Sequence, residues 1–97
     1  MTITEFNETI KTGTEPVHLE KPLQSLWHDA RGEWARAHDL AQADPGIDAA
    51  RVHAYLHRKE GDESNALYWY TQAGSAAVNF SLEEEWDSLV NEFLKKT

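Results

Sequence analysis

The 97-residue sequence contains no cysteine, which excludes disulfide bonds, thiolate nucleophiles and metal sites built from thiolates. It has no signal-peptide pattern and no apolar run approaching the roughly 18 residues of a membrane-spanning helix. No stretch alternates β-branched with polar residues, so no β-strand is predicted. These absences favour a helical protein, and we expect it to be cytoplasmic.

Basic residues are also scarce, because nine lysines and arginines stand against 17 aspartates and glutamates, for a formal net charge of -8. A surface this acidic repels phosphate backbones and anionic lipids. We therefore expect neither a nucleic-acid partner nor a membrane partner. The partners left are a protein or peptide, a small anion held at a local basic cluster, or a second copy of the chain in a homodimer.

Apolar residues recur at spacings of three and four along most of the chain, which predicts an all-α fold. The length suits one small domain over residues 1–97. We expect an N-terminal helix and connector over residues 1–21 and two antiparallel helical hairpins over residues 22–75. An amphipathic helix over residues 81–96 is expected to cap the exposed end of the array.

Capping-box signatures predict where the first and last helices begin. Thr2 is followed three residues later by Glu5, and Ser81 is followed three residues later by Glu84. In each pair, one side chain can satisfy a free backbone N–H of the other residue. Gly13 is placed to end the first helix, since glycine readily adopts the left-handed conformation of a helix stop.

Three breaks divide residues 22–75. Gly32 is expected to separate two helices rather than to interrupt one long helix, and Gly61 is expected to end another. Between them, Asp44 is predicted to cap a helix whose first residue is Pro45, where the missing N–H of proline costs nothing. The second hairpin is therefore expected to contain helices over about 46–60 and 63–74, with Asp62 capping the latter.

A pattern of glycine, acid and small residues occurs twice, as Gly32-Glu33-Trp34-x-x-Ala37-x-x-x-Ala41 and Gly61-Asp62-x-x-x-Ala66-x-x-x-Tyr70-x-x-Ala73. The second copy resembles the second half of a tetratricopeptide unit, where small residues let two helices lie close together. The resemblance covers roughly residues 20–75 and implies stacked helical hairpins with a concave groove. The two glycines are 29 residues apart (61 minus 32), whereas the motif repeats at about 34 residues.

A longer stretch carries a second resemblance. The residues HAYLHRKEGDESNALYWYTQAG, at 53–74, together with DARGEWARAHDLAQ, at 29–42, resemble a family of short bacterial and fungal proteins. This resemblance supports the helical interpretation and implies no particular activity.

Basic and aromatic residues share one face of the helix expected over 46–60. In a tetratricopeptide register, Arg51, Tyr55 and Arg58 point into the groove. Arginine offers a planar pair of donors and tyrosine a directed hydroxyl, so the three side chains suit a carboxylate. On the following helix, Tyr68 and Asn65 lie off the apolar stripe and are expected to line a polar pocket. The alternative is a solvated face whose arginines pair with neighbouring acids.

Histidines form the other candidate site. His53 and His57 are four residues apart and share a helix face, and Glu60 follows them. Together with His38 from the preceding helix, they have the ligand types of a zinc site. Histidines between helices more often form hydrogen bonds within the core, so the sequence favours a structural role. We accordingly expect no cofactor.

The functional ranking follows from these two candidates. A helical binding module, which holds an acidic peptide or a small anion in its groove, comes first. A structural or homo-oligomerising protein that pairs through Leu82, Trp86 or Phe93 comes second, and a histidine-based metal-dependent enzyme third. The sequence contains no H-E-x-x-H, G-x-S-x-G, P-loop or dinucleotide-binding motif, so an enzyme is the less favoured class.

Overall fold

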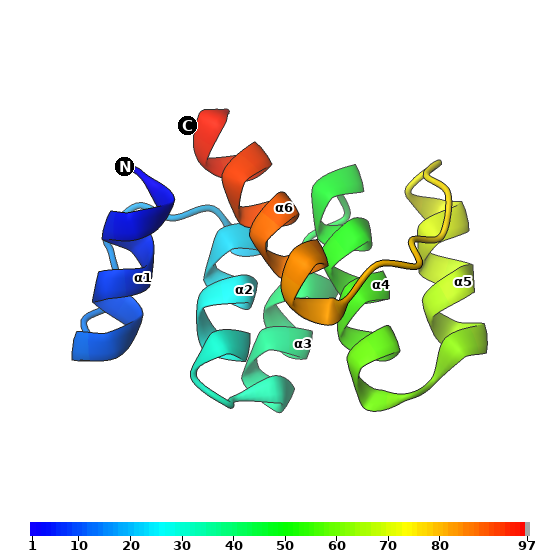
Figure 1. Ribbon diagram of the computed structural model, residues 1–97. Coiled ribbons are helices and arrows are strands. Elements are labelled where there is room, and N and C mark those ends of the chain that lie inside the picture. Colours follow the sequence, from blue (N-terminus) through cyan, green and yellow to red (C-terminus); the bar gives the residue numbers. More distant parts are fainter. Residues whose placement is uncertain (97) are drawn as a thin grey trace.

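The computed structural model describes residues 1–96, and over this range the chain is all-helical with no strand. Figure 1 shows α2 to α5 side by side, with α1 at one edge and α6 crossing in front. The predicted all-α class is confirmed. No helix within these residues is both long enough and apolar enough to cross a membrane. The helices are α1 (Ile3–Thr12), α2 (Lys21–Ala30), α3 (Trp34–Gln42), α4 (Ile47–Glu60), α5 (Glu63–Gln72) and α6 (Leu82–Lys95).

Both predicted capping boxes are present. The Thr2 hydroxyl accepts from the backbone N–H of Glu5, whose carboxylate accepts from the N–H of Thr2 in return. Ser81 and Glu84 make the same reciprocal pair at the start of α6. Gly13 ends α1 with a left-handed φ of 79°. These ends are set by local hydrogen bonds, which is why short patterns predict them.

The glycine breaks are also confirmed. Gly32 adopts a φ of 79° between α2 and α3, so it separates two helices. Gly61 ends α4 with a φ of 89°, and the Asp62 carboxylate accepts from the backbone N–H of Asn65 to cap α5. A residue with a side chain would be strained at either glycine, because these φ values lie in the left-handed region.

The helix expected from about 46 begins at Ile47, and its predicted cap is wrong by two residues. The N-cap is Gly46 and the helix begins at Ile47, so neither Asp44 nor Pro45 holds its expected position. The Asp44 carboxylate instead accepts from the N–H of Gly46 at 2.8 Å. This short-range bond stabilises a turn before the helix, which is a second common use of an aspartate near a helix start.

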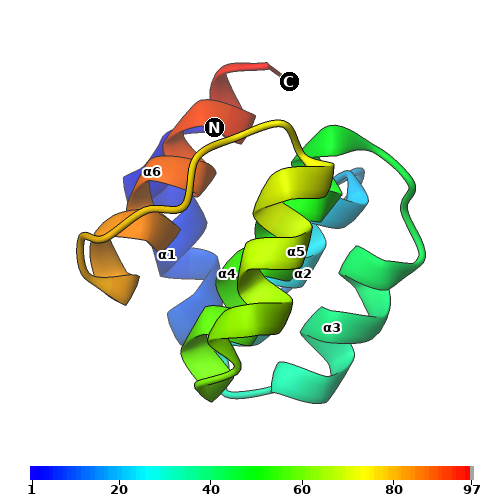
Figure 2. The ribbon, with the colours of Figure 1, turned by 90° about the vertical axis from the view of Figure 1, so that its right-hand side faces the viewer.

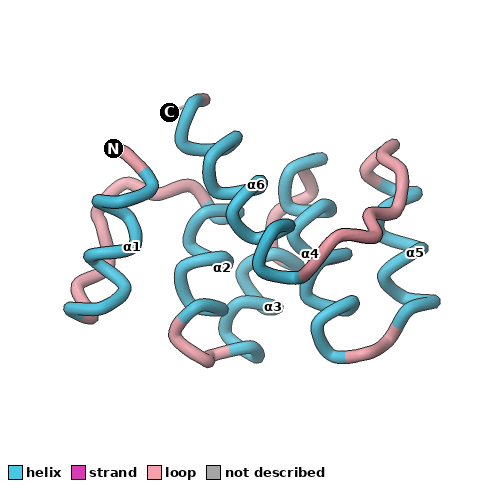
Figure 3. Tube along the Cα trace, in the orientation of Figure 1, coloured by secondary structure: helices cyan, strands magenta, loops and turns pink. Residues whose placement is uncertain are grey.

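Helix α4 is the centre of the molecule. It packs against α2, α3, α5 and α6, and Figure 2 shows α6 and α3 on opposite sides of it. The amphipathic α6 was expected to cover the end of the array, but its main helix contacts are with α2 and α4. Figure 3 shows the two longer connectors, residues 13–20 and 73–81, that allow α1 and α6 to reach these positions.

The core is formed by the apolar stripes of these helices. Phe93 is only 4 % exposed, and Leu82 and Trp86 are partly buried against the same cluster. Phe93 therefore offers no exposed surface for dimerisation, while a homodimer that pairs through Leu82 or Trp86 stays a prediction. The largest fully buried apolar side chains are Phe6, Leu23, Leu26, Val52, Leu56 and Val90.

Candidate functional site

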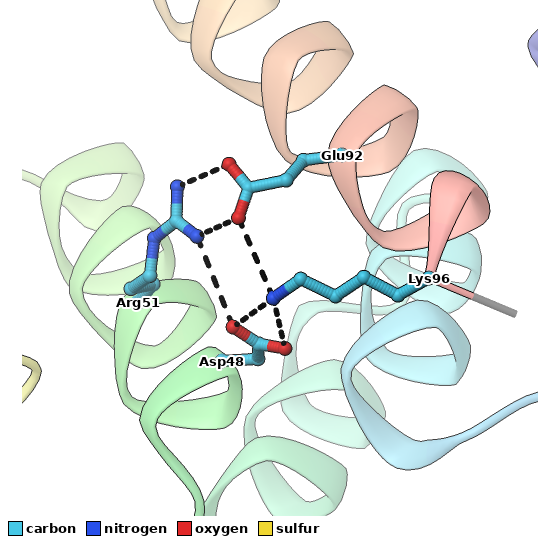
Figure 4. Close-up of polar contacts among 4 residues, drawn as sticks. All are labelled: Asp48, Arg51, Glu92 and Lys96. Carbon is cyan, nitrogen blue, oxygen red and sulfur yellow. Dashed lines mark hydrogen bonds and ion pairs between the residues drawn. The ribbon is translucent and has the colours of Figure 1, made fainter.

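The predicted groove residue Arg51 is paired with acids of its own chain. Its guanidinium donates two hydrogen bonds to the Glu92 carboxylate of α6, one of them at 3.1 Å. Figure 4 shows Asp48 and Lys96 completing a cluster of alternating charge around this pair. The hydrogen bonds from Arg51 hold the pKa of the Glu92 carboxyl below its ordinary value. The arginine therefore binds α6 to α4.

Arg58, two helical turns further along α4, is also paired with α6. It donates to the Glu85 carboxylate at 3.0 Å and to the backbone carbonyl of Phe80. Glu85 is 3 % exposed and also accepts the Tyr70 hydroxyl at 2.6 Å. Burial, followed by this hydrogen bond to Glu85, raises the pKa of Tyr70. A buried carboxylate with two donors is satisfied, so Arg58 has a structural role here.

Tyr55 is buried between helices rather than exposed in a groove. Its hydroxyl donates to the Asp29 carboxylate at 2.7 Å, and Lys59 donates to the other oxygen at 2.9 Å. Burial, and then the nearby charge of Asp29, raises the pKa of Tyr55. The expected open strip of Arg51, Tyr55 and Arg58 is therefore corrected, because helix partners within the chain occupy all three.

The sequence did contain a signal for this pairing. Arg51 and Arg58 are seven residues apart on α4 (58 minus 51), and Glu85 and Glu92 are seven apart on α6 (92 minus 85). Seven residues are close to two helical turns, so each pair lies along one face. Two antiparallel helices with matched charges at the same spacing form both ion pairs in a single register.

The two polar candidates on α5 are not brought to the arginines. Tyr68 is exposed, as expected, at 54 % of its surface. Asn65 is half-buried, and its backbone N–H donates to the cap residue Asp62. Both lie on α5, whereas the arginines make their side-chain ion pairs with α6. A ligand contact at Tyr68 or Asn65 stays a prediction.

Three histidines converge between α3 and α4. The Nε2 atoms of His38 and His53 are 2.9 Å apart. One ring nitrogen each from His38, His53 and His57 lies within 4.8 Å of the others. His53 and His57 are buried, and His38 is half-buried. The residues that the sequence ranked low as metal ligands thus bring three ring nitrogens together.

Two tryptophans hold the cluster from either side. Trp34 stacks on the ring of His38 with centroids 4.9 Å apart, and Trp69 stacks on His53 at 4.0 Å. The Trp34 indole N–H also donates to the backbone carbonyl of Leu56, which fixes the ring on α4. Sequence reasoning missed these contacts. Each depends on how α3 and α5 pack against α4.

His38 and His53 are held in the neutral form. Burial first, and then the neighbouring His38 and His57, lower the pKa of His53 to about 4. The pKa of His38 is also lowered, first by burial and then by His57. A neutral imidazole keeps one nitrogen lone pair free to accept a proton or bind a metal. At neutral pH these two rings therefore carry no positive charge.

Glu60 orients one of the three rings. Its carboxylate oxygen lies 2.6 Å from Nδ1 of His57. A proton on Nδ1 satisfies this contact and leaves Nε2 as the lone-pair nitrogen. The pairing of a histidine with a carboxylate is a common second layer around metal sites. In a second group, made of His57, Glu60 and Asp62, one ligand atom from each residue also lies within 4.8 Å of the others. The sequence prediction did not include Asp62.

Comparison with known proteins adds no family to this description. No protein-family model, no curated protein and no solved structure matches the chain. The two resemblances drawn from the sequence stay predictions, and the function is argued from the residues themselves.

Proposed function

We propose that the protein is a small helical module that binds one divalent transition-metal ion, with Zn²⁺ as the first choice, through His38, His53 and His57. The observation that carries the proposal is the convergence of three ring nitrogens within 4.8 Å of one another on two packed helices. This replaces the expectation of no cofactor. Imidazole suits zinc, copper and nickel, and the chain has no thiolate to compete.

The spacing of the donors is close to that of a coordinated ion. Zinc–nitrogen bonds are about 2.0–2.1 Å, which puts two ligands of a tetrahedral ion about 3.3 Å apart. His38 and His53 need to separate slightly from their 2.9 Å contact, and His57 needs to move inward. Side-chain rotation supplies such shifts without moving a helix. Three protein ligands leave the fourth position for water or another ligand.

The charge state favours the same role. Metal ligands must be deprotonated, and histidines that are already neutral lose no binding energy to proton release. Because burial and the neighbouring histidines lower the pKa of His53 to about 4, its ring stays neutral across the neutral range. Glu60 contributes by holding the tautomer of His57 that directs Nε2 to the ion.

The framework we propose for this site is tetratricopeptide-like. The packing of α2 on α3 and of α4 on α5 supports it. Small residues at the expected helix-contact positions of α3 and α5 support it as well, since Ala37, Ala41, Ala66 and Ala73 are all buried. In this framework, α6 lies on the side where such proteins present a groove, which explains why the arginines there are already paired.

Zinc titration of untagged, metal-free protein at about pH 7 tests the proposal by calorimetry and thermal unfolding. We expect one ion per chain and a stabilisation of about 2.7 kcal/mol when free zinc is one hundred times Kd. The replacements His53→Gln and His57→Gln should abolish the stoichiometric heat. Glu60→Gln should weaken binding by about tenfold to a hundredfold, since it acts only through His57.

The matched control is His18→Asn. His18 is exposed and has a φ of 64°, a conformation that asparagine tolerates well. This variant removes one histidine outside the cluster and should bind zinc as the wild type does. Wild-type protein that shows neither heat nor thermal shift with zinc would contradict the proposal. Equal binding by His53→Gln would also contradict it, because it would assign the ion to surface carboxylates.

A further inference from the structure

A cavity of about 500 Å³ lies on the side of α4 that faces away from the histidines, between α1, α2, α4 and α6. This volume falls in the range of small-molecule sites. Ile10, Leu82 and the indole of Trp86 form most of its apolar wall, and Tyr55 forms part of its floor. The cavity uses none of the proposed metal ligands, so it is a separate feature of the molecule.

Hydrogen bonds to α2 fix the two aromatic side chains of the cavity. The Trp86 indole N–H donates to the backbone carbonyl of Leu26 at 3.0 Å. The Tyr55 hydroxyl donates to Asp29 at 2.7 Å. Because both rings are tied to neighbouring helices, the cavity keeps its shape without a ligand. A pre-formed site avoids the entropy cost of ordering side chains on binding.

The charges around the cavity are unequal. The Asp29 carboxylate is neutralised by Lys59 at 2.9 Å. At the mouth, Glu83 and Asp87 lie one turn apart on α6 and are both exposed, and Lys11 is the remaining base. None of the ion pairs within residues 1–96 uses either of these two carboxylates. The mouth therefore carries two free negative charges against one positive charge.

From this arrangement we infer that the cavity binds a small organic monocation, a primary amine on an aromatic or branched apolar body. The apolar body packs against Trp86 and Ile10, where burial of its surface drives binding. The ammonium group lies at the mouth beside Glu83 and Asp87, close to the indole face that also attracts a cation. An anion with the same apolar body meets two repelling carboxylates.

Three probes with one apolar body test this inference: 4-phenylbutylamine, 4-phenylbutanol and 4-phenylbutyrate. Each is titrated into the full chain and followed by amide chemical-shift changes in NMR spectra. We expect the amine to bind in the low-millimolar range or tighter, and about tenfold tighter than the carboxylate. The shifted amides should cluster at α1, the end of α2 and the start of α6. Equal affinity for amine and carboxylate, or shifts elsewhere, would overturn the inference.

Two double variants that remove the same charge test whether the carboxylates at the mouth contribute to amine binding. Glu83→Gln with Asp87→Asn should weaken amine binding by about fivefold or more and leave the alcohol unchanged. The control, Glu8→Gln with Asp39→Asn, removes the same charge from exposed positions outside the cavity and should keep the amine preference. An equal loss of amine affinity in both double variants would assign the effect to net charge and overturn the proposed site.

A cavity-filling variant keeps the test independent of charge. Ala30 lies at the cavity on the last turn of α2, and its exposed position tolerates a larger side chain. Ala30→Phe should block all three probes while the circular dichroism spectrum stays helical. Wild-type affinity for the amine in this variant would show that binding occurs elsewhere.

Discussion

The two sides of α4 treat polar side chains differently. On the side of α2 and α6, Arg51, Tyr55 and Arg58 each donate to a carboxylate on another helix. On the side of α3 and α5, His53 and His57 contact other imidazoles, indoles and one glutamate. On the first side each donor meets a carboxylate, whereas on the second side one imidazole donates a hydrogen bond to another, between Nε2 of His38 and Nε2 of His53.

This contrast separates structural polar groups from functional ones. A buried ion pair with complete hydrogen bonding has a structural explanation, because removing either partner leaves the other as an unpaired buried charge. The three imidazoles are also hydrogen-bonded, His38 to His53 and His57 to Glu60, but their ring nitrogens converge within 4.8 Å of one another. Such a convergence suits a metal ion. We therefore treat the arginine-bearing face of α4 as structural and the histidine face as the candidate site.

The largest effect is expected on the paired side, for Glu85→Ala. This change leaves the Tyr70 hydroxyl and one Arg58 donor without their buried acceptor. The free energy of unfolding should fall by roughly 3 kcal/mol, as for other broken buried pairs. Urea denaturation measures it, with Glu8→Ala as the control, because that exposed residue should change stability by less than about 0.5 kcal/mol. If Glu85→Ala lowers the free energy of unfolding by no more than Glu8→Ala does, the structural role of the paired side is contradicted.

On the histidine side, His53→Leu is expected to have an intermediate effect. It should remove zinc binding and leave the stability of the metal-free protein nearly unchanged. In the presence of a chelator, stability should change by less than about 1 kcal/mol, because leucine fills the site and half-buried His38 can bond to water. The thermal shift that zinc gives to the wild type should disappear in this variant. Thermal unfolding with and without zinc measures both. A loss of stability in chelator as large as that of Glu85→Ala would assign His53 a structural role.

The smallest effect is expected for the pH dependence of stability that Glu92 contributes on the paired side. The hydrogen bonds from Arg51 lower the pKa of Glu92 in the folded state, so the unfolded chain takes up this proton first as the pH falls. The stabilisation is thus present above the ordinary carboxyl pKa and is lost as the pH falls through the lowered folded value. Comparing urea midpoints of wild type and Glu92→Gln between neutral and acid pH should show a shallower acid loss in the variant. Parallel curves would contradict the assignment.

The sequence predicted the local features of the fold, but it predicted the candidate site only in part. The capping boxes at Thr2 and Ser81 and the stop at Gly61 are confirmed, because each depends on residues within one turn. The cap of α4 was misplaced, because Asp44 has two local uses that sequence alone does not distinguish. Spacing placed His53 and His57 on one face, and the sequence offered His38 as a further ligand, but only the packing of α3 on α4 brings the three rings together.

The sequence by itself determined an all-helical chain, most of the ends of its helices and which residues share a helix face. Tertiary structure alone decided that the acids of α6 pair with Arg51 and Arg58, and that His38 meets His53. The physical reason is that helix ends depend on backbone groups a few residues apart. Contacts between helices depend instead on the relative register of two packed surfaces, which the burial of the whole core sets together.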